Sequence, residues 1–443
     1  MKNNAIHSPE WLNKNAIYQI NPRTFSKEGT IEAITKELPF LKELGFNIVY
    51  LCPIFEEDTS DDINNWSPRQ IASKTGNPKN PYRMNDYFNI DEEYGTMEDL
   101  KKMITKAHEL DMKVLLDLVY AHIGPNAPII QKHPEFVKQN SDGSFIYTVW
   151  NFPELDFRSE GLREYLYCNM VYYIAVIDAD GFRLDVGDAI PVDFWKEARR
   201  RIQRVKKDAV LINEGRAYEN MTIAFDSTYC FGWHEILRKV YCDSESAAQL
   251  RDFHENMAQN IPCCSKILRD IDNHDTVTDW EGRTETIAGN KGMEQIEVIN
   301  YLIDGIPMVY SGNELACDAK LSMFANRFHM GSFEVTDRNN KSNKASVRRQ
   351  EVMKTLNKMK SESDLLKLGK TIWIETSAPD SIIAFKRVLN ENEILFFGNT
   401  KNSNITIDIK DIANSKKCIL YNGEHKIENN MLYLSPYEYV VFE

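Results

Sequence analysis

The stretch Asp180-Gly181-Phe182-Arg183-Leu184-Asp185-Val186-Gly187 alternates apolar and charged residues. Read as a β-strand, it places its three large apolar side chains on one face and Arg183 and Asp185 on the other, because successive side chains point to opposite faces. Charges on the inner face of a sheet are costly unless they are paired. Two explanations are open for the charged face of this strand. It is either part of a structural ion-pair network, or it presents a functional carboxylate that the neighbouring guanidinium keeps ionised.

Short apolar runs alternate with helical patterns on both sides of this strand. Strands are expected at 16–25, 47–55, 113–120, 180–186, 209–214, 227–230, 266–271 and 308–310. Helices are expected at 31–44, 97–112, 162–177, 194–205, 233–240, 295–302 and 347–359. About eight strand–helix repeats over ~300 residues predict an α/β protein with a parallel (β/α)8 TIM barrel. A doubly wound open sheet is the alternative, but no Gly-x-Gly-x-x-Gly turn follows the first strand.

Two long connections and a change in the sequence pattern near the C-terminus divide the chain. Residues 56–92 follow the second strand, and the Pro-rich residues 122–159 follow the third. Long loops after strands belong to the catalytic face of such barrels. Short alternating strands separated by Asn, Gly and Lys turns predict an all-β sandwich at the C-terminus. The expected organisation is a barrel of residues 1–121 and 160–365, a short domain inserted after strand three at 122–159, and a C-terminal β-sandwich domain at 366–443.

The composition, with 42% hydrophobic and 27% charged residues among 443, is typical of a soluble globular protein. A net charge of −13 argues against nucleic acid and against anionic membrane surfaces. No run reaches the ~20 apolar residues of a membrane helix, and residues 1–11 lack the apolar core of a secretory signal. The eight cysteines form no Cys-x-x-Cys pair, which favours free thiols. We expect a cytoplasmic protein without nucleic-acid or membrane partners, and leave its oligomeric state open.

Charged or imidazole side chains collect at the carboxyl ends of four predicted strands. They are Asp117 and His122 at the third, Arg183 and Asp185 at the fourth, Glu214 at the fifth, and His274 and Asp275 at the seventh. Strand ends converge at one face of a barrel, so these groups are expected to meet. One such carboxylate alone is more often structural, but four strands ending this way favour a functional site.

Three carboxylates beside one arginine suit chemistry at an acetal. Retaining glycoside hydrolysis needs an ionised nucleophile and a protonated acid about 5–5.5 Å apart. Arg183 is expected to lower the pKa of Asp185 and to keep it ionised as a nucleophile. Glu214 follows a largely apolar strand, where a less polar setting and nearby carboxylates would hold its proton near neutrality.

These segments resemble the α-amylase family of retaining α-glucoside-active enzymes. The matching motifs, in the family's order, are Asp117-Leu-Val-Tyr-Ala-His122, Gly181-Phe-Arg-Leu-Asp185, Asn213-Glu214-Gly215 and Asn273-His274-Asp275. The resemblance covers essentially the whole chain. It implies that Asp185 is the nucleophile that forms a β-glycosyl-enzyme intermediate and that Glu214 is the general acid/base. Asp275 would bind sugar hydroxyls and stabilise the transition state.

The resemblance also implies a set of substrate-binding residues. Arg183, His122 and His274 would bind the sugar at the cleavage subsite, and Asp117 would orient Arg183. Tyr82 lies where the family stacks an aromatic ring on that sugar, with packing inside its loop as the alternative.

Several positions depart from the family's pattern. Ala121 stands where many members have an Asn that helps to bind structural calcium, and Asp188-Ala189 replaces a Lys-His pair whose His contributes to the same site. We therefore predict no metal at the usual calcium position, and no other cofactor. Arg83 stands where many relatives have an Asp that grips a terminal sugar, which argues against strict exo action. Trp150, Phe152 and Trp280 are candidates for outer sugar subsites, with packing beneath long loops as the alternative.

The predicted function is that of a retaining glycoside hydrolase that cleaves α-glucosidic bonds of α-glucans or malto-oligosaccharides by double displacement. A transglucosylase or isomerase on the same scaffold, in which a sugar intercepts the intermediate, is a close alternative. A catalytically silent amylase-like binding protein is another, against which the presence of all three carboxylates argues. Linkage, chain length and endo or exo action are left open.

Overall fold

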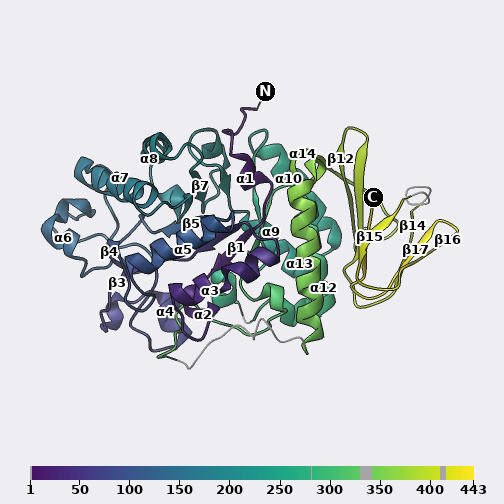
Figure 1. Ribbon diagram of the computed structural model, residues 1–443, viewed down its shortest axis with the longest axis horizontal. Helices are drawn as coiled ribbons and strands as arrows, with labels where there is room; N and C mark the ends of the chain where they lie inside the picture. The colour runs from purple at the N-terminus through teal and green to yellow at the C-terminus, as the bar shows by residue number, and fades with distance from the viewer. Residues whose placement is uncertain (1, 281, 330–341, 410–415) are drawn as a thin grey trace.

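A computed structural model describes residues 2–280, 282–329, 342–409 and 416–443 (Figure 1). Its barrel strands are β1 (Ile17–Ile20), β2 (Ile48–Leu51), β5 (Lys113–Leu118), β6 (Gly181–Leu184), β7 (Val210–Asn213), β8 (Ser227–Thr228), β9 (Leu268–Arg269) and β10 (Ile306–Tyr310). They pair in parallel in the order β8-β7-β6-β5-β2-β1-β10-β9. A parallel bridge between Thr228 and Ile267 joins the two ends. This closed parallel barrel confirms the predicted fold class, and each predicted barrel strand is present.

Helices cover the outside of the barrel. The longer ones are α3 (Ile31–Glu43), α5 (Met97–Glu109), α7 (Glu160–Ala175), α8 (Val192–Val205), α9 (Phe231–Tyr241), α10 (Ala247–Asn260), α12 (Glu285–Leu302) and α13 (Lys344–Glu362). Short helices are α1 (Glu10–Asn13), α2 (Pro22–Phe25), α4 (Pro68–Ser73), α6 (Pro128–Lys132), α11 (His274–Asp279) and α14 (Asp364–Leu368). The sequence did not predict α10, because the apolar pattern of this helix is weak. Its buried side includes His254, whose Nε2 lies 2.5 Å from Asp304 Oδ1. No helix among the described residues is long and apolar enough to cross a membrane.

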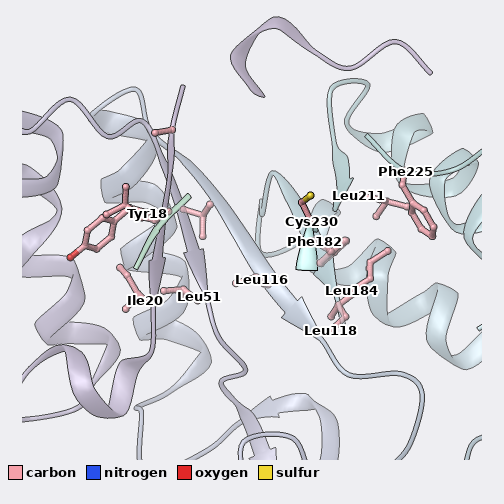
Figure 2. Packing of buried hydrophobic residues seen from close by; sticks show 14 of the residues in the cluster. Tyr18, Ile20, Leu51, Leu116, Leu118, Phe182, Leu184, Leu211, Phe225 and Cys230 are labelled. Carbon is pink, nitrogen blue, oxygen red and sulfur yellow. The ribbon is translucent and has the colours of Figure 1, made fainter. Parts of the chain in front are cut away.

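The barrel strands separate two environments, as their alternating side chains predict. Phe182 and Leu184 belong to the large apolar cluster between strands and helices, together with Leu116 and Leu211 (Figure 2). A smaller apolar cluster is built from the opposite strand faces, with members such as Ile17, Leu115, Ile212 and Met308. Arg183 and Asp117 point to this second, inner side. Full burial of one large apolar side chain stabilises the fold by roughly 1.5–3 kcal/mol. The two apolar clusters therefore hold in place the strands that carry the charged residues.

The C-terminal part is a β-sandwich, as predicted. One sheet has the order β11 (Lys370–Trp373), β12 (Ile382–Leu389), β13 (Asn392–Asn399), β18 (Tyr439–Phe442) and β15 (Cys418–Tyr421). The other has the order β14 (Ile405–Asp408), β17 (Met431–Leu434) and β16 (Lys426–Glu428). Leu395 and Phe397 of the first sheet share an apolar cluster with Ile407 and Leu432 of the second. The sandwich lies beside α12 and α13 (Figure 1). The domain limits at 121, 159 and 365 remain predictions, and the last of them falls within α14.

Two loop regions rise from the carboxyl ends of β2 and β5. Residues 56–92 contain α4 and β4 (Met84–Ile90), which pairs antiparallel with β3 (Phe55–Glu57) at the start of the loop. Residues 122–159 contain α6 and isolated bridges that fold the segment on itself, among them His122 to Glu154 and Val137 to Leu155. Both regions therefore lie on the face where the strand ends carry their charged residues.

Candidate active site

Arg183 on β6 is the centre of the charged cluster. Its Nη1 donates to Asp117 Oδ1 at 2.7 Å and to Asp185 Oδ1 at 2.9 Å, and its Nη2 lies 2.9 Å from Glu214 Oε2. The side chain of Arg183 is 1% exposed. Carboxylates at the ends of three neighbouring strands thus meet on one buried guanidinium, which explains how charges are tolerated on the inner face of this sheet.

Aromatic residues hold this arginine in place. The Arg183 Cζ lies 6.0 Å from the ring centroid of Tyr82 and 5.6 Å from that of Tyr229. Tyr50 donates its hydroxyl to Asp117 Oδ2 at 2.6 Å, which fixes the carboxylate behind the arginine. The sequence did not single out Tyr50 or Tyr229, since a Tyr inside an apolar strand has the pattern of a core residue.

A hydrogen-bond chain connects Tyr82 to the other site residues. Gln19 Nε2 lies 2.8 Å from His274 Nδ1, His274 Nε2 lies 2.5 Å from the Tyr82 hydroxyl, and that hydroxyl lies 3.2 Å from Asp117 Oδ2. Burial lowers the pKa of His274, so the neutral ring accepts from Gln19 at Nδ1 and donates from Nε2. The Tyr82 ring also stacks on His274 at 5.5 Å. Tyr82 therefore lies in the charged cluster and not only within its own loop.

His122 is buried against two aromatic residues of the inserted segment. Its ring centroid lies 5.4 Å from that of Trp150 and 5.0 Å from that of Phe152. Burial lowers its pKa to about 4, so the ring is neutral, and its Nε2 donates to the Tyr82 carbonyl at 2.9 Å. Its Nδ1 is buried without a hydrogen-bond partner among the described residues. This nitrogen is an acceptor that a hydroxyl group can satisfy.

The backbone after Asp185 adopts an unusual conformation. The strand ends at Leu184, and Val186 has φ 44° and ψ 43°, so the prediction that Val186 continues the apolar face of the strand is wrong. A β-branched residue in this left-handed region costs of order 1–3 kcal/mol and is a frequent mark of functional sites. The Val186 N–H donates to Glu214 Oε2 at 2.8 Å. The turn thereby links the residue next to Asp185 with the carboxylate of Glu214.

Burial dominates the pKa of both Asp185 and Glu214. Burial raises the pKa of each of them, Arg183 opposes this effect, and the neighbouring carboxylates add to it. Arg183 lowers the pKa of Asp185, as expected, but burial and the neighbouring carboxylates outweigh it, so the expected low pKa of Asp185 is wrong. A raised pKa favours the protonated form, so Glu214 is suited to hold the proton of a general acid.

Asp275 has different partners. Its Oδ1 accepts from Arg69 Nη2 at 2.7 Å, and its Oδ2 lies 3.3 Å from His274 Nε2. Burial acts to raise the pKa of Asp275, but the positive charges of Arg69 and Arg183 hold it below the usual range. Arg69 belongs to the long loop 56–92, where no periodic pattern marked it in the sequence.

These groups surround a cavity of about 70 Å³. Its lining residues are Ser67, Arg69, Asn80, Tyr82, His122, Trp150, Phe152, Asp185, Val186, Glu214, Asp275, Met323 and Phe324. Trp150 and Phe152 line the cavity, and the outer-subsite role remains a prediction for both. Trp280 is not among these lining residues, and its ring instead packs on Arg238, whose Cζ lies 4.2 Å from the ring centroid.

Arg83 and Ala121 occupy structural positions. Arg83 is fully buried and donates to backbone carbonyls, including those of Asn65 and Pro78 at 2.7 Å. It therefore stabilises the 56–92 loop. The Ala121 carbonyl accepts from the Leu155 N–H at 3.2 Å. The structure brings all eight predicted site residues together, but it does not test the role assigned to each of them.

Comparisons with known proteins agree with this geometry. The family model described as alpha amylase, catalytic domain, matches residues 13–151 and 138–365. The model of the alpha-amylase SusG C-terminal domain matches residues 382–441. Among curated proteins, a cyclomaltodextrinase of Thermoanaerobacter pseudethanolicus is 23% identical, with 98% of this chain and 78% of that protein covered. An intracellular maltogenic amylase of Bacillus subtilis is also 23% identical, with 99% and 77% covered.

Solved structures share the fold. A maltogenic alpha-amylase from Thermotoga neapolitana, described as noncanonic, superposes with a TM-score of 0.81 at 24% identity, covering 98% of this chain and 99% of that one. An alpha-amylase from Geobacillus thermoleovorans, solved in complex with acarbose, has a TM-score of 0.76 at 20% identity, with 99% of both chains covered. The match of the catalytic-domain model across most of the chain shows that this protein belongs to the alpha-amylase family.

Proposed function

We propose that this protein is a retaining glycoside hydrolase that cleaves α-glucosidic bonds of malto-oligosaccharides or α-glucans by double displacement. The observation that carries the proposal is the pairing of Asp185 and Glu214 on one buried guanidinium beside a cavity. The reaction requires the state in which Glu214 holds a proton and Asp185 is ionised.

Each residue then has a defined step. Glu214 gives its proton to the glycosidic oxygen as that bond breaks, and Asp185 forms a bond to the anomeric carbon from the β face. Glu214, now ionised, takes a proton from water, which attacks the same carbon and displaces Asp185 with retention of the α configuration. Asp275 remains anionic beside the developing positive charge of the sugar ring. The unpartnered Nδ1 of His122 would accept a hydroxyl of the bound sugar.

The substrate class and the location follow from the relatives' names. The relatives include a cyclomaltodextrinase and maltogenic amylases, and two of the latter are called intracellular. We therefore propose α-linked oligosaccharides or glucans as substrates and the cytoplasm as the location. Product analysis with maltotriose tests the reaction: glucose and maltose are expected, with the α anomer formed first. Failure to degrade any α-linked oligosaccharide would contradict the proposal.

A glucosyl or maltosyl transferase is a second candidate. An alpha-1,4-glucan:maltose-1-phosphate maltosyltransferase of Picrophilus torridus is 25% identical, with 90% of this chain and 62% of that protein covered. The first chemical step would be the same, but a sugar would replace water in the second. Products longer than maltotriose in the same assay would favour transfer.

Removal of calcium is expected to leave the protein unchanged. The side chain of Ala121 offers no oxygen ligand, and the described residues contain no group of three or more His, Cys, Asp or Glu side chains placed to hold a metal. A chelator such as EDTA should therefore shift the melting temperature by less than about 1 °C, since only a ligand bound to the folded state stabilises it. A large decrease, reversed by added Ca²⁺, would overturn this prediction.

Asp188 is expected to position Glu214. Its Oδ1 accepts from Asn213 Nδ2 at 2.9 Å, and its Oδ2 accepts from the backbone N–H groups of Arg216 and Ala217 at 2.5 and 2.8 Å. These bonds fix the chain on both sides of Glu214. Asp188→Ala should lower kcat on maltotriose by about 10–100-fold, because small displacements of a catalytic group are costly.

The choice of substrate leaving group shows whether Asp188 positions Glu214 or only stabilises the fold. An aryl α-glycoside with an acidic phenol needs little proton donation, so Asp188→Ala should affect its cleavage much less. An equal loss on both substrates would indicate a general disturbance of the site and would contradict the role of Asp188.

A further inference from the structure

Gln19 is a buried amide on the otherwise apolar inner face of β1. It stands two residues after Ile17, so both side chains take the same face of the strand. Ile17 belongs to the inner apolar cluster, whereas Gln19 is polar and 0% exposed. Burial of an amide costs free energy unless the amide forms hydrogen bonds. The hydrogen-bond partner of Gln19 therefore has to account for its presence here.

That partner is the ring of His274. Gln19 Nε2 lies 2.8 Å from His274 Nδ1, and Gln19 Oε1 has no hydrogen-bond partner among the described residues. An amide NH2 group only donates, so Nδ1 must be the unprotonated nitrogen of the ring. Burial lowers the pKa of His274, so the ring is neutral and its single N–H proton lies on Nε2.

The other side of the ring requires the same tautomer. His274 Nε2 lies 2.5 Å from the Tyr82 hydroxyl and 3.3 Å from Asp275 Oδ2. Arg69 donates to the other oxygen of Asp275 at 2.7 Å and opposes the effect of burial, which keeps this carboxylate ionised. An unprotonated Nε2 would set its lone pair against an anionic oxygen, whereas an N–H group is attracted to it. An inverted Gln19 amide, which would need the ring proton on Nδ1, is therefore unfavourable.

The direction of donation continues beyond His274. The protonated Nε2 donates to the oxygen of the Tyr82 hydroxyl, whose own proton can then be donated to Asp117 Oδ2 at 3.2 Å. Asp117 accepts in turn from Arg183. One amide on β1 thus sets the direction of a hydrogen-bond chain that ends at the guanidinium of the charged cluster.

We propose that Gln19 is a positioning residue, which fixes His274 as the Nε2–H tautomer and so directs the ring proton toward Tyr82 and Asp275. Tyr82 and Asp275 are among the residues that line the cavity, and Gln19 and His274 are not, so Gln19 acts through its neighbours. With the proton on Nδ1, the ring would repel Asp275 and give no hydrogen bond to Tyr82. The expected effect on activity rests on the proposed glycoside hydrolase function, whereas the tautomer does not.

NMR reads the tautomer without any substrate. In protein labelled with ¹⁵N-histidine, long-range ¹H–¹⁵N spectra distinguish protonated from unprotonated ring nitrogens, because the two nitrogens of a neutral ring differ. His274→Gln identifies the signals of His274 among the nine histidines. A protonated Nε2 and an unprotonated Nδ1 are expected in the wild type. A proton on Nδ1 would overturn the proposal.

Gln19→Glu keeps the shape of the side chain but replaces the donor by an acceptor. Near neutral pH, the new carboxylate should hold the ring proton on Nδ1, and kcat/KM on maltotriose should fall about 10–100-fold through the displaced neighbours. This loss is smaller than the ~10⁴-fold effect of a wrong tautomer in a histidine that itself transfers protons.

The pH dependence of this loss separates positioning from a structural role. At lower pH, the carboxylate and the ring together bind a further proton, Nε2 is protonated again, and the loss should shrink. The other titratable and charged groups around His274 affect both proteins, so the ratio of variant to wild type isolates the change; they are Asp275, Asp117, Tyr82, Arg183 and Arg69. An equal loss at every pH with an unchanged tautomer would overturn the proposal.

Two further variants complete the experiment. Gln19→Met keeps the length of the side chain without a donor, so the Nδ1–H form should become detectable and kcat/KM should fall by a smaller factor, even if Gln19→Glu fails to fold. An unchanged tautomer and an unchanged kcat/KM in Gln19→Met would refute the role of Gln19. Ile17→Val alters the same strand face and should leave the tautomer as in the wild type; a shifted tautomer there would also refute a specific role. A wild type inactive on α-linked oligosaccharides would refute the proposed function, and the NMR result would still decide the tautomer.

Discussion

Asp185→Asn is expected to lower kcat on malto-oligosaccharides by about 10⁴-fold or more, the loss typical of removing a catalytic nucleophile. The amide oxygen can still accept from Arg183 Nη1, so the cluster keeps its geometry while the attacking group loses its charge. Because burial raises the pKa of Asp185, removing this carboxylate relieves an unfavourable buried charge. The melting temperature of the variant should therefore equal or exceed that of the wild type.

Azide can replace the lost nucleophile in the variant Asp185→Ala, and the product then identifies the role of Asp185. In Asp185→Ala, azide can occupy the space of the lost carboxylate and displace the leaving group of an aryl α-glycoside in one step. The bond from the anomeric carbon to oxygen breaks as the bond to nitrogen forms, which gives a β-glycosyl azide and the free phenol. Activity of Asp185→Asn close to that of the wild type would disprove the assignment, and so would an α-glycosyl azide from Asp185→Ala.

Glu214→Ala is expected to lower kcat by about 10²–10⁴-fold on natural oligosaccharides, the range of general acid catalysis. On an aryl α-glycoside with an acidic phenol, the first step needs no proton, so the intermediate on Asp185 should accumulate after an initial burst. Azide should then release this intermediate as an α-glycosyl azide, the opposite stereochemistry to that expected from Asp185→Ala. The two variants therefore act as controls for each other.

The pH profile gives an independent test of Glu214. In the wild type, activity should fall as the pH rises through the pKa of Glu214, because the proton that Glu214 donates is lost. Since burial raises the pKa of Glu214 above its usual value, this decline should begin later than for an exposed carboxyl group. Glu214→Gln should show no such alkaline decline on an activated aryl substrate. Retention of the decline would mean that another group provides the proton.

The sequence predicted the parts of the site that are encoded in barrel strands. A strand fixes which face each side chain takes, so Asp117, Arg183 and Asp185 could be assigned to one side from their alternation alone. The barrel order then brings the ends of β5, β6 and β7 together. The spacing of the strands along the chain was therefore enough to predict that Glu214 lies near Asp185.

Features set by loops and tertiary contacts could not be derived in the same way. The contact between Arg69 and Asp275 depends on the path of 56–92, where no periodicity limits the conformation. The left-handed turn at Val186 contradicts the local preference of a β-branched residue, and only the surrounding structure explains it. The raised pKa of Asp185 depends on its burial and on neighbouring carboxylates, which the adjacent Arg183 in the sequence does not reveal.

The closure of the barrel has a consequence for heat inactivation. β8 and β9 contain two residues each, and a single bridge from Thr228 to Ile267 joins them among the described residues, whereas β2 and β5 share four register pairs. The junction of β8 and β9 is therefore expected to be the weakest strand pairing of the barrel. Its backbone amides should exchange hydrogen faster than those of the other barrel strands. Glu214 precedes this junction and Asp275 follows it, so local opening would separate them while most of the helices stay folded. Activity is then expected to disappear on heating before the overall secondary structure does.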